Sequence, residues 1–84
     1  MHKVLVTGAS AGIGRAVALA LAREGALVTA VGRHSATLET ALRDLPGAGH
    51  RALAADLATP DGLARVVGEV EQGGHDVLVN NAGV

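Results

Sequence analysis

The sequence feature that most constrains the fold is a glycine-rich turn near the amino terminus, Val4-Leu5-Val6-Thr7-Gly8-Ala9-Ser10-Ala11-Gly12-Ile13-Gly14-Arg15. An apolar run precedes the turn, and a helical pattern follows it directly. Gly8, Gly12 and Gly14 have no Cβ, so the backbone can bend sharply and a bulky ligand can approach closely. The first amides of a helix are free, and its amino end is partly positive. A strand, this turn and a helix therefore predict a site for the pyrophosphate of a dinucleotide.

The glycine spacing differs from the usual dinucleotide fingerprint, G-x-G-x-x-G. Here the spacing is Gly8-x3-Gly12-x-Gly14. Taken alone, three glycines also fit an ordinary tight turn. The strand-like run before them and the helical pattern after them favour the ligand-binding interpretation.

Strand-like and helical segments alternate along the whole chain. Strands are predicted at 2–6, 26–31, 50–54 and 76–79, and helices at 13–24, from Ser35 to about 45, and from Pro60 to about 72. Ser35 and Thr59 are the expected N-caps, and Gly25 and Gly73-Gly74 the expected stops. Because crossovers are right-handed, this βαβαβαβ pattern predicts one α/β domain over residues 1–84: half of a Rossmann-type doubly wound parallel sheet, with strand order 3-2-1-4.

Apolar spacing also predicts which helix residues face the core. The expected inward residues are Ile13, Val17, Ala20 and Leu21 in the first helix, Leu38, Ala41, Leu42 and Leu45 in the second, and Leu63, Val66, Val67 and Val70 in the third.

Composition excludes several classes of protein. The chain has no cysteine, which rules out disulfides and thiolate metal sites. It has no aromatic residue, a net charge of −1 and scattered basic residues, which argues against nucleic-acid binding. Its apolar runs are far shorter than the roughly 20 residues of a membrane span. No signal peptide is recognisable, so a cytoplasmic location without a membrane partner is expected.

Two motifs resemble one known family. Thr7-Gly8-Ala9-Ser10-Ala11-Gly12-Ile13-Gly14 resembles the T-G-x-x-x-G-x-G segment of the short-chain dehydrogenases/reductases, and Asn80-Asn81-Ala82-Gly83 resembles their N-N-A-G segment. The resemblance runs from Lys3 to Val84 and covers only the amino-terminal half of such an enzyme. It implies a nicotinamide dinucleotide cofactor and, for a full-length relative, a homo-oligomer.

The four segments that follow the predicted strands are expected to meet at the carboxyl edge of the parallel sheet, where ligands bind. Ser10 can bond a phosphate or ribose hydroxyl, or only its own turn. By resemblance, Asp56 accepts a hydrogen bond from the adenine amino group, although an aspartate there can also simply cap a turn. Asn80 is expected to be structural and Thr7 to stabilise the turn. The candidate cofactor-binding residues are Gly8, Ser10, Ala11, Gly12, Ile13, Gly14, Arg33, Asp56, Leu57, Asn81, Ala82 and Gly83.

Arg33 bears on the choice of cofactor. Folds that prefer NAD place an acid at the end of the second strand, where it holds the ribose 2′-hydroxyl. No acid lies between Gly25 and Glu39, and Arg33 offers a planar cation to a 2′-phosphate. NADP is therefore expected rather than NAD. The alternative is a solvated surface arginine, and Ala11 stands where relatives that use NADP often have a second base.

No catalytic residue and no metal site are predicted. The family's catalytic tyrosine, followed by a lysine four residues on, has no counterpart, because the chain has no tyrosine and Lys3 is its only lysine. The histidines lack metal-ligand spacing. The expected function is the NAD(P)-binding portion of an oxidoreductase that transfers hydride between the cofactor and a carbonyl or alcohol. This portion is expected to be inactive alone. The alternative is a non-catalytic nucleotide-binding or interaction fragment.

Overall fold

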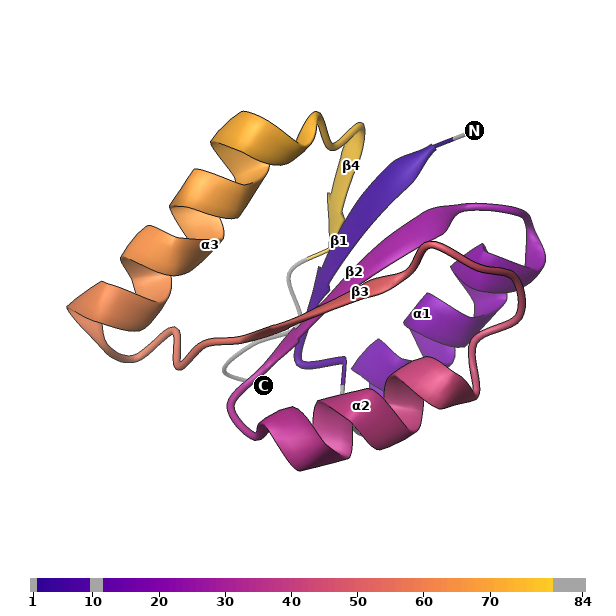
Figure 1. Cartoon of the computed structure of the whole chain (residues 1–84), viewed down its shortest axis with the longest axis horizontal. Helices are drawn as coiled ribbons and strands as arrows, with labels where there is room; N and C mark the ends of the chain where they lie inside the picture. Colours follow the sequence, from indigo (N-terminus) through magenta and orange to yellow (C-terminus); the bar gives the residue numbers. More distant parts are fainter. Residues whose placement is uncertain (1, 10–11, 80–84) are drawn as a thin grey trace.

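The computed structural model describes residues 2–9 and 12–79. These residues form a parallel sheet flanked by helices (Figure 1). The elements follow one another as β1 (Lys3–Thr7), α1 (Gly12–Arg23), β2 (Leu27–Gly32), α2 (Ser35–Arg43), β3 (Arg51–Ala54), α3 (Pro60–Gly73) and β4 (Val77–Val79). The expectation of a Rossmann-like α/β fold is confirmed, and the bounds lie within two residues of those predicted.

The strands lie in the order β3-β2-β1-β4, and every pair is parallel. In the central register, Val4 lies beside Val28 of β2 and Val77 of β4. Since all strands run the same way, the segments that follow them emerge at one edge of the sheet. That edge holds the candidate site.

The two faces of the sheet carry separate parts of the core. Helices α1 and α2 cover one face, and α3 covers the other (Figure 1). The larger cluster includes Val4, Val6, Val28 and Leu38, and the smaller one joins Leu5 and Val31 to Val66 of α3. Side chains alternate along each strand, which explains why neighbouring residues of β1 belong to different clusters.

The predicted inward faces are confirmed for α2 but wrong in part for α1 and α3. Leu38, Ala41 and Leu45 of α2 are buried. In α1 the buried residues are Gly14, Ala18 and Ala22, whereas Ile13 and Ala20 are exposed. Small residues allow the helix to approach the sheet closely, so they form the contact in place of larger neighbours.

Helix α3 departs from the prediction in the same way. Gly62 and Val66 are buried, whereas Leu63, Val67 and Val70 are exposed. Val66 packs on Leu5 and Val31 of the sheet, and Gly62 lies against the Asp56 backbone in the turn after β3, where a Cβ would have no room. Within the described residues, no helix is long and apolar enough to cross a membrane.

The helix ends confirm one predicted cap and correct the other. Thr59 is the N-cap of α3, its Oγ1 accepts the Gly62 amide at 3.0 Å, and Pro60 follows at the first helical position. For α2 the N-cap is His34 and not Ser35, because the Leu38 amide bonds the His34 carbonyl and Ser35 is already helical. Gly25 and Gly74 take left-handed conformations after α1 and α3, as expected.

Candidate functional site

The candidate site lies at the carboxyl ends of β1, β2 and β3, where backbone hydrogen bonds continue just beyond the strands. The Ala9 amide donates to the Val31 carbonyl at 3.1 Å, and the Ala55 amide donates to the Gly32 carbonyl at 2.8 Å. These bonds fix the turn after β1 and the turn after β3 against the end of β2. The sequence-predicted segments around Gly8, Arg33 and Asp56 are thereby brought to one edge of the sheet.

Two glycines of the turn take the left-handed conformation that glycine favours. Gly8 has a φ of 64° and Gly12 a φ of 60°, a region that residues with a Cβ rarely adopt. Gly12 starts α1, and apart from its chain neighbours and its own helix, no described residue has an atom within 4 Å of a Cβ built on it. The described residues therefore leave room beside Gly12 at the amino end of α1. Ser10 and Ala11 lie outside the described residues.

Ile13 and Gly14 continue the turn into the helix. Gly14 is buried against the sheet, whereas Ile13 is 69% exposed. A large apolar side chain at the surface beside an open helix end is available to contact a ligand. Ile13 is thus wrongly predicted as a core residue, while its predicted contact with the cofactor is compatible with its position.

Arg33 follows Gly32 at the end of β2 and precedes α2. It is exposed, and among the described residues the ion pairs join His2 to Asp76, Arg15 to Asp44 and Arg51 to Glu69. Arg33 takes part in none of these pairs. Its guanidinium is therefore not neutralised by a carboxylate within this part of the chain.

Asp56 has the turn-capping role that sequence analysis gave as its structural alternative. Its Oδ1 accepts the Ala58 amide at 2.9 Å, and its backbone carbonyl accepts the Thr59 amide and hydroxyl. The residue therefore caps the turn that leads into α3. A carboxylate has two oxygens with several lone pairs, so the turn bond leaves capacity for a ligand. Leu57, the next residue, packs partly buried against the cluster under α3.

Thr7 connects the ends of β1 and β4. It is 3% exposed, and its Oγ1 donates to the Val79 carbonyl at 3.4 Å. This bond ties β1 to β4, and the expected role of Thr7 in stabilising the glycine turn stays a prediction. The remaining predicted residues, Asn80, Asn81, Ala82 and Gly83, lie outside the described residues, directly after Val79.

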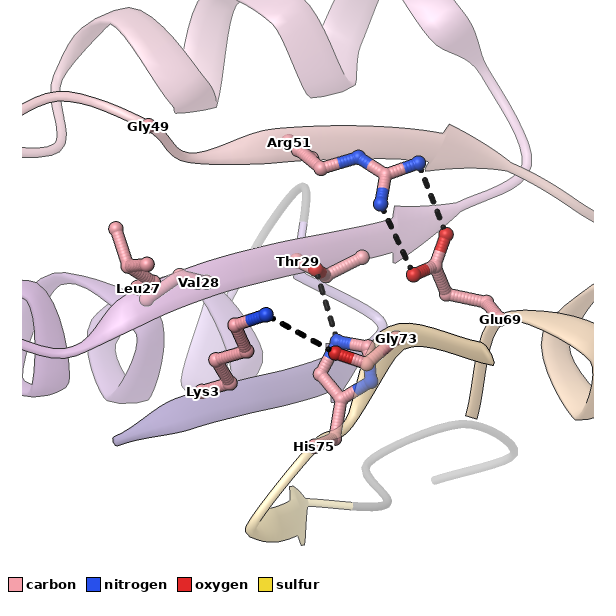
Figure 2. Close-up of a pocket in the computed structure, with 9 residues that line it drawn as sticks. All are labelled: Lys3, Leu27, Val28, Thr29, Gly49, Arg51, Glu69, Gly73 and His75. Carbon is pink, nitrogen blue, oxygen red and sulfur yellow. Dashed lines mark hydrogen bonds and ion pairs between the residues drawn. The ribbon is translucent and has the colours of Figure 1, made fainter. Parts of the chain in front are cut away.

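Hollows also lie between elements of the described residues, and the sequence analysis did not indicate them. One, of about 280 Å³, lies between α1 and α2 and is lined by Arg15, Ala36, Thr37, Thr40 and Ala41. A second, of about 130 Å³, lies at the opposite, amino edge of the sheet on the α3 side (Figure 2). The described residues contain no cluster of three or more His, Cys, Asp or Glu that could hold a metal ion.

Figure 2 shows how polar side chains from separate elements meet around the second hollow. Arg51 and Glu69 form a two-pronged ion pair at 3.1 Å, and Glu69 is nine-tenths buried. Lys3 Nζ donates to the Gly73 carbonyl at 3.3 Å, and His75 Nε2 lies 3.1 Å from Thr29 Oγ1. These contacts fasten the end of α3 to the sheet, away from the candidate site.

The fold and the site define a class of nucleotide-binding α/β protein, in which a glycine-rich turn joins the first strand to the first helix. A sequence profile of the short chain dehydrogenase family matches residues 2–84. The chain therefore belongs to the short-chain dehydrogenase/reductase family.

Individual relatives support this assignment. D-erythrulose reductase of Gallus gallus is 49% identical over 83 residues, and L-xylulose reductase of Homo sapiens is 44% identical; each match covers 99% of this chain and 32% of the relative. A solved L-sorbose reductase from Gluconobacter frateurii, complexed with NADPH and L-sorbose, superposes with a TM-score of 0.84 at 44% identity. That match covers 99% of this chain and 34% of the reductase. The chain thus spans about a third of the length of its relatives.

Proposed function

We propose that this chain is the NADP-binding portion of a short-chain oxidoreductase that transfers hydride between the nicotinamide and a carbonyl or alcohol. The proposal rests on the convergence, at one edge of the sheet, of the left-handed Gly8 and Gly12, of Asp56, and of Arg33, which has no ion-pair partner among residues 2–9 and 12–79. The L-sorbose reductase solved with NADPH, which is 44% identical, supports the cofactor class.

Each part of the site has a role that its chemistry supports. The turn from Gly8 to Gly14 and the first amides of α1 hold the pyrophosphate, because the bare backbone and the helix dipole both favour a close anion. Ser10, Ala11 and Ile13 belong to this turn and are included among the proposed cofactor-binding residues. Asp56 and Leu57 hold the adenine, with the carboxylate accepting its amino group. Asn81, Ala82 and Gly83 line the ribose beside the nicotinamide.

Arg33 supports NADP over NAD. A 2′-phosphate gains charge-assisted hydrogen bonds from a guanidinium, whereas the carboxylate typical of NAD sites would repel it. Arg33 has no ion-pair partner among residues 2–9 and 12–79, so its charge remains available.

The 84 residues supply cofactor binding and not catalysis. The bound cofactor would supply the hydride chemistry. The proton that a carbonyl requires has no donor of the family's kind here, because the chain contains no tyrosine. We expect the chain to bind the cofactor and to turn over no carbonyl.

A fluorescence titration tests the proposal. The chain has no aromatic residue, so the emission of reduced nicotinamide can be followed without a protein background. Saturable enhancement with NADPH, and a weaker response with NADH, are expected. A folded sample that binds neither cofactor would overturn the proposal.

A pair of glycine substitutions separates binding from folding. Gly12 and Gly74 have φ values of 60° and 64°, and apart from chain neighbours and each helix's own backbone, a Cβ on either would meet no atom of the described residues within 4 Å. Gly12→Ala and Gly74→Ala should therefore each cost about 1–2 kcal/mol of stability from backbone strain. Only Gly12→Ala should weaken NADPH binding, by roughly tenfold or more, because only Gly12 lies where the pyrophosphate would bind. Equal binding by both variants would contradict the assigned site.

A further inference from the structure

Gly62, in the first turn of α3, lies so close to the backbone of Asp56 that no side chain fits between them. A Cβ built on Gly62 would lie 1.9 Å from the Asp56 carbonyl oxygen, 2.5 Å from its carbonyl carbon and 2.7 Å from its nitrogen. Real Cβ atoms essentially never lie within 3.0 Å of such an atom. All three atoms are backbone atoms and cannot rotate away, so a larger residue at 62 would have to displace the turn or the helix.

Hydrogen bonds join the same two segments through the N-cap of α3. The Gly62 amide donates to Thr59 Oγ1 at 3.0 Å, and this hydroxyl donates in turn to the Asp56 carbonyl at 2.9 Å. The Thr59 amide donates to the same carbonyl at 3.0 Å. The backbone of Asp56 is therefore held by two bonds from Thr59 and by its direct contact with Gly62.

This arrangement also orients the Asp56 carboxylate. Its Oδ1 accepts the Ala58 amide at 2.9 Å, within the turn that Gly62 and Thr59 hold. A carboxylate has two oxygens, so this bond fixes the direction of the group and leaves the second oxygen for a ligand. A shift of the turn would therefore move the carboxylate with it.

The turn is the part that would yield to a larger residue, because both of its flanks are anchored. Before it, the Ala55 amide donates to the Gly32 carbonyl at 2.8 Å and holds the end of β3 on β2. After it, Val66 packs the next turn of α3 on β1 and β2. The displacement caused by a Cβ at Gly62 would thus fall on residues 56–59.

We propose that Gly62 is a positioning residue of the cofactor site. Its missing Cβ lets α3 hold the turn after β3 in the place where the Asp56 carboxylate meets the adenine amino group. The inference rests on the proposed function, in which Asp56 accepts a hydrogen bond from that amino group. Gly62 acts through the backbone of Asp56, and it is not among the site residues predicted from the sequence.

The test compares NADPH with its analogue in which hypoxanthine replaces adenine, using the fluorescence of the reduced nicotinamide. The analogue presents a carbonyl oxygen where adenine has its amino group, so it cannot donate that hydrogen bond to Asp56. We expect the original chain to bind NADPH roughly tenfold more tightly than the analogue, as befits one hydrogen bond to a charged group. Gly62→Ala should bind the two nucleotides with nearly equal affinity, because its carboxylate no longer meets the amino group.

Gly68→Ala is the matched control, with the same substitution in the same helix. Apart from chain neighbours and the helix's own backbone, a Cβ on Gly68 would meet no atom of the described residues within 4 Å. This variant should keep the full preference for NADPH. A purely structural effect would change both affinities together, so the ratio of the two affinities reports the position of Asp56.

A second pair of variants decides the matter if Gly62→Ala does not fold. Thr59→Val removes the hydroxyl that joins Gly62 to Asp56 and should also narrow the preference, whereas Thr59→Ser keeps the hydroxyl and should retain it. An undiminished preference in Gly62→Ala, or in Thr59→Val where only that variant folds, would overturn the positioning role. An original chain that binds both nucleotides equally would instead refute the adenine contact of Asp56, and one that binds neither would refute the proposed function itself.

Discussion

At the scale of single residues, the proposed preference for NADP over NAD depends on Arg33. It is exposed at the end of β2 and has no carboxylate partner in the part of the chain that the structure describes. Arg33→Asp should weaken NADPH binding roughly 10- to 100-fold, because a charge-assisted contact is lost and a repulsive carboxylate replaces it. Binding of NADH should be unchanged or improved, since a carboxylate can hold the 2′-hydroxyl.

The matched control for this substitution is Arg43→Asp, which makes the same change at an exposed arginine in the last turn of α2. Dissociation constants from fluorescence titration compare the two variants. If Arg33→Asp weakened the binding of NADPH and NADH equally, or if Arg43→Asp weakened NADPH binding as much, the proposed role of Arg33 would be wrong.

At the scale of elements, α1 depends on small side chains where it meets the sheet. Ala18 is 2% exposed, whereas Ala20, half a turn away, is exposed. Ala18→Leu should lower the free energy of unfolding by about 1–3 kcal/mol because the added atoms have no space. Ala20→Leu should change it by no more than about 0.5 kcal/mol. Urea unfolding measures both, and equal effects would show that α1 packs on a different face.

Helix α3 offers a sharper comparison between neighbours. Val66 is 7% exposed and Val67 is 47% exposed. Val66→Ala should cost about 1–3 kcal/mol of stability through the cavity it leaves, and Val67→Ala no more than about 0.5 kcal/mol. A larger loss of stability for Val67→Ala than for Val66→Ala in urea unfolding would instead support the apolar face that the sequence pattern predicts.

These helices show what the sequence could and could not predict. Continuous apolar runs and glycine stops predicted the strands, the helices and the parallel α/β class. The apolar spacing predicted the buried face of α2 but favoured Ile13 and Leu63, whereas the small residues Ala18 and Gly62 are the buried ones. Hydrophobic periodicity gives weight to large side chains, while close approach of a helix to a sheet requires small ones. Thr59 formed its cap as expected, but the cap at Ser35 moved to His34 because the first helical bond starts there.

At the scale of the molecule, the two edges of the sheet have different chemistry. The carboxyl edge gathers the glycine turn, Arg33 and Asp56, and it could be predicted because parallel strands place the loops that follow them together. At the amino edge, polar side chains bond to partners from distant segments of the chain (Figure 2): Lys3, Thr29, Arg51, Glu69 and His75. Those pairs have no spacing signature, so only the folded chain reveals them.

The most direct test of the central claim is to map NADPH onto the folded chain by the change in its amide resonances. The account predicts that the largest changes fall on Gly8, Ala9, Gly12 to Gly14, Arg33 and Asp56, at the carboxyl edge of the sheet. Amides at the amino edge, around Lys3 and His75, should remain unchanged. Changes concentrated at the amino edge or along α3, or no change at saturating NADPH, would contradict the claim.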